Sequence, residues 1–298
     1  MLANAEKRSK GLLSAPFLCL ALLLFSITSH AQQLIIPATD TLPDDSTQTQ
    51  SGKQLEPDFI VPSRPTLSNP AEFQRAGVLQ IEYGYDGSFR NLDSSTQQSA
   101  PVALRFAAAS RLLLELDLDT VNSQKDAVGA RETGIGDTTI GIQGVAVRET
   151  EQHPALAFAY YFKLPTASVE KGLGSGRVDH KIIALISKTI NRTDIDFNAA
   201  YLIVGREGEA GWVTGGQAAL AFSQNFKRNY SLQGELSGQT KDDAQPVGLF
   251  ALGALAYKVN RRLVLDSGMR FGLTHDTPRI GIFAGLTVGV ADLYRKKL

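Results

Sequence analysis

The chain has 298 residues, and its 30 basic and 30 acidic residues give a formal net charge of zero. Such a balance argues against a nucleic-acid partner, because nucleic-acid binding requires an excess of basic residues on one surface. The single cysteine, Cys19, lies in an apolar stretch near the N-terminus. The rest of the chain therefore offers neither a disulfide nor a thiolate metal site, and we expect no cofactor.

The first 31 residues have the pattern of a secretory signal peptide. An apolar run over 12–27 precedes the small residues Ser29 and Ala31, which favour cleavage before Gln32. The basic region before the run consists of Lys7, Arg8 and Lys10. A membrane anchor is the alternative, but the run is short for a span and is interrupted by Pro16. We expect the chain to pass through the inner membrane and lose residues 1–31.

The next segment, residues 32–74, is rich in Pro, Ser, Thr, Asp and Gln and shows no hydrophobic period. Prolines at this density disfavour regular structure. We expect an irregular segment that acts either as a tether or as a plug and that supplies no strand. Residues 75–298 form the remaining domain.

From Gly77 onward, apolar residues alternate with small, polar or charged ones. The clearest case is RLLLELDLD at 111–119, where one parity holds Leu112, Leu114, Leu116 and Leu118 and the other holds the charged residues. Successive side chains of a strand point to opposite faces, so one face of this segment is apolar and the other is charged. Such a strand occurs both in a membrane barrel and in a soluble sandwich, and the N-terminus and the loop lengths distinguish the two.

Twelve such strands can be assigned, and most have nine or more residues, which suits a tilted bilayer crossing. They span 77–88, 100–108, 111–121, 136–148, 154–164, 179–189, 194–205, 212–225, 229–240, 246–258, 263–274 and 279–292. Short turns alternate with longer connections, as is typical of outer-membrane barrels. We expect an all-β fold, a transmembrane antiparallel up-and-down β-barrel of about 12 strands, with both termini on the periplasmic side.

Charged residues on the inward parity are the candidates for lining the lumen. They are Glu82, Arg105, Arg111, Glu115, Asp117, Asp119, Asp137, Lys163, Asp194, Asp196, Glu235, Asp266 and Arg270. Acids outnumber bases in this set. A narrow lumen of one sign concentrates counter-ions, so a conducting pore of this composition should prefer cations.

Two other classes of protein share parts of this pattern. A soluble lipocalin-like barrel also alternates, but it needs about eight strands and an apolar interior. An outer-membrane phospholipase needs a serine activated by a nearby histidine. His153, His180 and His275 are the histidines after residue 31, and none is followed two residues later by serine. We therefore expect no enzymatic activity and no catalytic residues.

Six stretches stand out by their order and spacing, namely Asn69–Gln74, Gly77–Tyr85, Gly134–Asp137, Lys163–Thr166, Leu173–Asp179 and Asp266–Gly289. Together they resemble an outer-membrane protein family named for a MetA pathway of phenol degradation. The resemblance implies an outer-membrane barrel and uptake of small aromatic or apolar compounds. Its partners would be outer-membrane lipids, small-molecule solutes and the outer-membrane assembly machinery. At the C-terminus, Asp292 breaks the parity on which Tyr294 lies, which leaves the end of the last strand undefined.

These observations favour an outer-membrane channel that passes small molecules passively. The alternative is a non-transporting barrel with an occluded lumen and a structural or surface role. Twelve strands enclose only a modest opening, which residues 32–74 are long enough to fill.

Overall fold

A computed structural model describes residues 58–89, 96–126, 129–206, 210–227, 229–240, 248–275 and 277–294. The expected signal peptide and residues 32–57 lie outside the described residues. Within those ranges, no helix is long and apolar enough to span a membrane.

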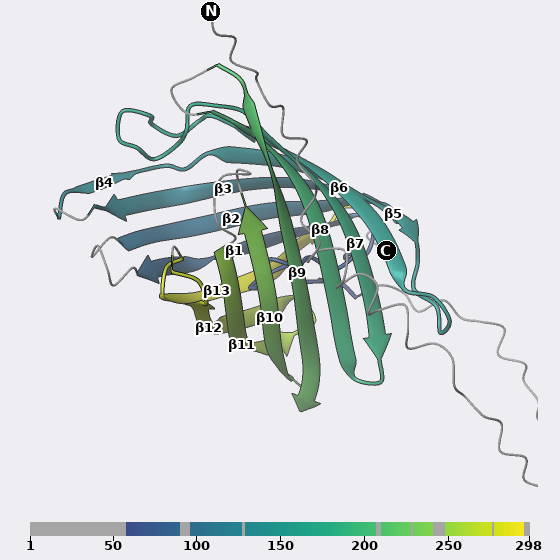
Figure 1. The fold of residues 1–298 in the computed structure, drawn as a ribbon. Coiled ribbons are helices and arrows are strands. Elements are labelled where there is room, and N and C mark those ends of the chain that lie inside the picture. Colours follow the sequence, from purple (N-terminus) through teal and green to yellow (C-terminus); the bar gives the residue numbers. More distant parts are fainter. Residues whose placement is uncertain are drawn as a thin grey trace, which may run out of the picture. The chain divides into compact units, whose positions relative to one another are not determined.

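The described residues form thirteen strands (Figure 1). They are β1 (Val78–Phe89), β2 (Thr96–Ala109), β3 (Leu112–Lys125), β4 (Arg131–Gly134), β5 (Thr138–Val147), β6 (Ala155–Leu164), β7 (Asp179–Ile190), β8 (Thr193–Gly205), β9 (Trp212–Lys227), β10 (Tyr230–Thr240), β11 (Gly248–Asn260), β12 (Leu263–Gly272) and β13 (Ile280–Asp292).

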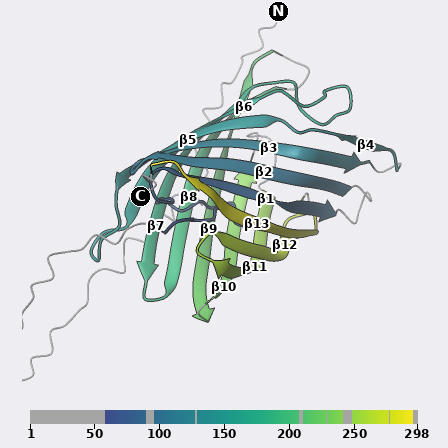
Figure 2. The same cartoon turned by 180° about the vertical axis from the view of Figure 1, so that it is seen from behind.

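Each strand pairs antiparallel with its neighbours, and the sheet closes on itself. The closing seam joins β1 to β13, while β2 pairs with both β1 and β3. The short β4 and the longer β5 pair with successive parts of β3 and together occupy one place in the wall. The result is the predicted closed antiparallel barrel of 12 strand positions, seen from opposite sides in Figures 1 and 2.

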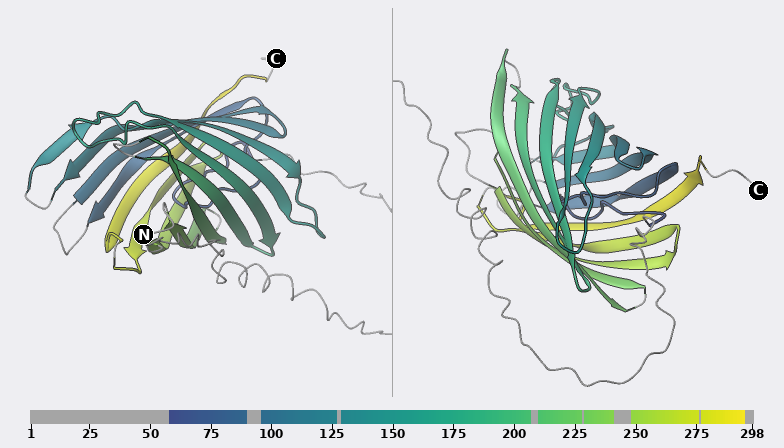
Figure 3. Two further views of the ribbon diagram at one scale, coloured as in Figure 1. Left: turned by 45° about the horizontal axis from the view of Figure 1, so that its top comes forward. Right: turned by 90° about the vertical axis from the view of Figure 1, so that its right-hand side faces the viewer.

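The two ends of the barrel differ in their connections. Tight turns join β2 to β3, β7 to β8 and β11 to β12 at one end, where β1 also begins and β13 finishes. We call this the turn end. The longer connections, such as residues 165–178 between β6 and β7, emerge at the opposite, loop end. Figure 3 gives two further views of the tilted strands between these ends.

The predicted alternation of faces is confirmed along β3. Leu114 is 43% exposed on the outer surface, whereas the adjacent Glu115 is 8% exposed. The same contrast separates exposed Leu265 from buried Asp266 in β12. Apolar side chains thus cover the outside, where lipid takes the place of water, and polar side chains gather inside.

Two strands extend farther toward the loop end than the sequence pattern predicts. β2 starts at Thr96 rather than at residue 100, and β3 continues to Lys125. The residues gained, such as Gln97 and Gln98, carry no apolar parity. Alternation is required only where one face meets hydrocarbon, so strands that continue beyond that zone leave no such signal.

Candidate pore interior

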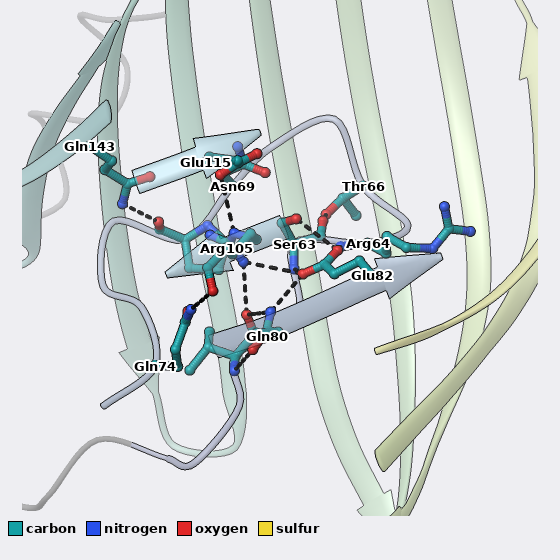
Figure 4. Close-up of polar contacts among 12 residues, drawn as sticks. Ser63, Arg64, Thr66, Asn69, Gln74, Gln80, Glu82, Arg105, Glu115 and Gln143 are labelled. Carbon is teal, nitrogen blue, oxygen red and sulfur yellow. Dashed lines mark hydrogen bonds and ion pairs between the residues drawn. The ribbon is translucent and has the colours of Figure 1, made fainter. Parts of the chain in front are cut away.

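Residues 58–77 run through the barrel interior before β1 begins, and we call them the inner segment (Figure 4). No residue of the inner segment belongs to a strand. Pro62, Pro65 and Pro70 punctuate it and remove backbone donors that a sheet would need. Its backbone groups instead bond to inward side chains from strands around the barrel.

Glu82 of β1 holds the first part of the inner segment. Its carboxylate accepts hydrogen bonds from the backbone N–H of Ser63 at 2.9 Å and of Arg64 at 3.0 Å. The Ser63 hydroxyl donates a third at 2.9 Å, and Gln80 donates to the same carboxylate at 2.7 Å. Hydrogen bonds to a charged acceptor are the strong class, so Glu82 is a principal anchor of the inner segment.

Arg105 of β2 lies beside this anchor and is fully buried. Its guanidinium group is 3.3 Å from the Glu82 carboxylate and 3.2 Å from that of Glu115. It also donates to the backbone carbonyl of Val61 at 2.9 Å. A buried charge is tolerated only when it is paired and hydrogen-bonded, and these acids supply that compensation.

The later part of the inner segment bonds to the opposite wall. The backbone N–H of Ser68 donates to the Glu235 carboxylate at 2.8 Å, and that of Asn69 donates to the Asn198 side chain at 2.8 Å. The Ala71 N–H donates to the Ser187 hydroxyl at 2.8 Å. These partners belong to β10, β8 and β7, so the inner segment links distant parts of the barrel wall.

Glycines in the wall make room for the inner segment at two places. Gly84 of β1 pairs with Gly285 of β13, and a Cβ atom at either residue would lie 2.5–2.6 Å from the Arg64 guanidinium group. A Cβ at Gly289 would lie 2.4 Å from the Phe59 ring. Close approach to backbone is possible here only because these wall residues lack side chains.

Two cavities lie on either side of the inner segment. The turn-side cavity has a volume of about 690 Å³ and borders the turn-end parts of β7, β8 and β9. The loop-side cavity has a volume of about 410 Å³ and borders β1, β2, β3 and β5. Residues of the inner segment line both cavities.

The predicted lumen residues are distributed over the anchors and the two cavities. Glu82, Arg105, Glu115, Glu235 and Asp266 are buried against or near the inner segment. The loop-side cavity is lined by Asp117, Asp119 and Asp137, and the turn-side cavity by Asp194 and Asp196.

The remaining candidates lie nearer the barrel ends. Lys163 bridges Asp137 at 3.0 Å and Asp179 at 2.7 Å, and Arg270 bonds Asp86 at 2.7 Å. Arg111 does not line the lumen, contrary to the expectation. It is exposed in the turn before Leu112, where its guanidinium group donates to the Ala146 carbonyl at 3.0 Å. Parity loses its meaning beyond the end of a strand.

Neutral polar residues of the interior were missed because only charged residues were selected. Gln80, Gln143 and Asn198 are buried and bond to the inner segment. Gln143, for example, donates to the Pro70 carbonyl at 3.0 Å. All three lie on the inward parity of their strands, so the same pattern would have identified them if it had included amides.

Comparison with solved structures supports this architecture. The chain is similar to the COG4313 outer membrane channel from Pseudomonas putida F1, with a TM-score of 0.61, 16% identity, and coverage of 76% of this chain and all of that one. A weaker likeness is to the CymD monoaromatic hydrocarbon channel, with a TM-score of 0.42, 9% identity, and coverage of 72% of this chain and 89% of that one.

Outer membrane phospholipase A from Escherichia coli aligns with a TM-score of 0.42 and 11% identity, over 75% of this chain and 96% of that one. No curated protein matches the sequence. The model of the family described as "Putative MetA-pathway of phenol degradation" matches residues 63–289, which include most of the inner segment and nearly the whole barrel. The chain belongs to this family, and its fold is that of an outer-membrane β-barrel.

Proposed function

We propose that the protein is a passive channel for small molecules in the outer membrane, with the inner segment acting as a plug that narrows the lumen. The observation that carries the proposal is the pair of cavities, about 690 and 410 Å³, on either side of the inner segment. A closed barrel with cavities toward each end has the basic form of a membrane pore.

The solutes we propose are small aromatic or apolar compounds, the class suggested by the family description. For ions, the acids of the lumen favour cations over anions. Asp117 and Asp119 line the loop-side cavity, and Asp194 and Asp196 line the turn-side cavity. Carboxylates around a narrow passage raise the local concentration of cations.

We place both chain termini and the turn end in the periplasm. Short periplasmic turns and longer extracellular loops are the usual arrangement in bacterial outer-membrane barrels. The outer-membrane assembly machinery would insert the barrel after secretion, and lipids would surround its apolar surface. Exposed side chains such as Leu114, Phe158 and Leu236 supply that surface.

The alternative is a structural barrel that transports nothing. The hydrogen bonds from Ser63, Arg64, Ser68, Asn69 and Ala71 to the wall favour it, because they hold the inner segment across the interior. The two hypotheses differ in whether a continuous path remains beside the inner segment.

Recordings from planar bilayers separate these hypotheses. Purified full-length protein should give discrete single-channel currents with a preference for cations. A correctly folded barrel, identified by heat-modifiable migration on gels, that gives no current and admits no small aromatic solute into liposomes would support the structural alternative.

A further inference from the structure

The two cavities approach each other at the inner segment, and Arg64 and Thr66 line both of them. A solute or ion that passes from one cavity to the other with the inner segment in place crosses between them there. The residues common to both cavities mark the place where the two cavities adjoin. Of the two, only Arg64 carries a charge.

The Arg64 side chain is held against the wall by an ion pair. Its Nη2 lies 3.3 Å from Asp266 Oδ1, and its Nε lies 3.4 Å from Asp266 Oδ2. The Arg64 side chain is 15% exposed and that of Asp266 is 3% exposed. Two contacts of this length bind less tightly than a short bidentate pair, and the guanidinium group keeps access to the cavities.

The wall behind Arg64 is shaped for this side chain. Gly84 and Gly285 face each other across the β1–β13 seam, and the guanidinium group occupies the space that a Cβ atom would fill. This space, which we call the glycine notch, lets the Arg64 side chain lie against the wall and away from the centre of the lumen. A side chain at either glycine would push the guanidinium group into the passage.

The Arg64 side chain is paired with Asp266, and the nearby Glu82, which accepts from the Arg64 backbone N–H, is itself paired with Arg105, whereas acids outnumber bases in both cavities. We propose that Arg64, balanced by Asp266, is the specificity-determining residue at the junction of the two cavities while the inner segment stays in place. This inference rests on the proposed channel function. Arg64 offsets the acidic lumen and offers a planar donor pair to carboxylate-bearing solutes that pass.

Charge-removing variants of the two partners test this proposal because they act in opposite directions. Arg64→Gln leaves the Asp266 carboxylate unpaired, so the cation-to-anion permeability ratio in planar bilayers should rise about threefold or more. Asp266→Asn leaves the Arg64 cation unpaired, and the ratio should fall by a similar factor. The double variant should return close to the wild-type ratio.

Matched controls separate this role from anchoring of the inner segment. Arg148 bonds Glu72 of the inner segment at 3.0 Å and lines only the turn-side cavity of the two. Arg148→Gln removes the same charge and also an anchor, yet it should leave the permeability ratio nearly unchanged. Arg64→Lys keeps the charge and should also keep the ratio. Gly285→Ala should lower the conductance by displacing the guanidinium group from the glycine notch.

The outcomes distinguish the proposal from the function on which it rests. Opposite shifts for Arg64→Gln and Asp266→Asn, with Arg148→Gln unchanged, support the assignment of Arg64. If Arg64→Gln and Asp266→Asn change the permeability ratio in the same direction, or leave it unchanged, the assignment of Arg64 is wrong even when the wild-type channel conducts. If the folded wild-type protein carries no current in planar bilayers, the proposed channel function itself is wrong. If Arg64→Gln does not fold, Asp266→Asn and Gly285→Ala decide the matter through the ratio and the conductance.

Discussion

The carboxylate of Glu82 should determine how firmly the inner segment is docked, and Glu82→Gln tests this directly. The substitution keeps the shape of the side chain but turns one acceptor oxygen into a donor. One oxygen accepts from the Ser63 hydroxyl and the Arg64 N–H, and the other accepts from the Ser63 N–H, Gln80 and Arg105. Either orientation of the amide therefore breaks at least two hydrogen bonds.

The magnitude follows from the charge of the acceptor. Gln80 and Arg105 are wall residues, so the substitution removes one or two hydrogen bonds to the inner segment, depending on the orientation of the amide. Each hydrogen bond to a charged group contributes about 1.5–3 kcal/mol, so docking weakens by about 1.5–6 kcal/mol. Loss of the negative charge also leaves buried Arg105 with less compensation, which acts in the same direction. We expect faster hydrogen exchange at the amides of residues 61–74 and larger, noisier single-channel currents.

Glu115→Gln is the matched control. Glu115 binds the same Arg105 at 3.2 Å from β3 and accepts from Tyr161 at 3.4 Å, both of them wall residues. This variant removes the same charge beside Arg105 but no direct hydrogen bond to the inner segment, so exchange at residues 61–74 should rise less than in Glu82→Gln. If Glu82→Gln shows wild-type exchange and wild-type currents, or if both variants loosen the inner segment equally, the assignment of Glu82 as its anchor is wrong.

Two further predictions concern the wall and the lumen. Leu114→Arg places a cation on the lipid-facing surface, which should destabilise the inserted barrel by about 2–4 kcal/mol near mid-membrane and impair insertion. Asp119→Arg, in the loop-side cavity, should insert normally. Equal yields of heat-modifiable barrel for the two variants would refute the assignment of faces. The double variant Asp194→Asn, Asp196→Asn removes two carboxylates from the turn-side cavity and should lower cation selectivity, measured from the reversal potential. An increase in cation selectivity would contradict the view that lumen acids attract cations.

The sequence predicts the barrel wall well because the bilayer imposes a strict rule on it. Each membrane-crossing strand must present apolar residues to lipid, so Leu114 and Glu115 reveal their faces by parity alone. Outside that zone the rule lapses, which is why the first residues of β2 and the position of Arg111 were not predicted correctly.

The path of the inner segment cannot be read from the sequence in the same way. Its contacts join residues far apart in the chain, such as Arg64 with Asp266 and Ser68 with Glu235. An irregular segment without a period gives no register against the wall. The glycines that receive it, Gly84 and Gly285, also look like ordinary glycines in strands until the fold brings Arg64 against them.

The most direct test of the channel hypothesis compares the single-channel conductance of the full-length protein with that of a variant lacking residues 58–75. Both proteins must first show heat-modifiable migration, which establishes that each barrel is folded. If the inner segment narrows an otherwise open lumen, the wild type should conduct in small steps and the deletion variant in steps several-fold larger. Equal conductance, or a folded deletion variant that carries no current, would contradict the account of a plugged pore.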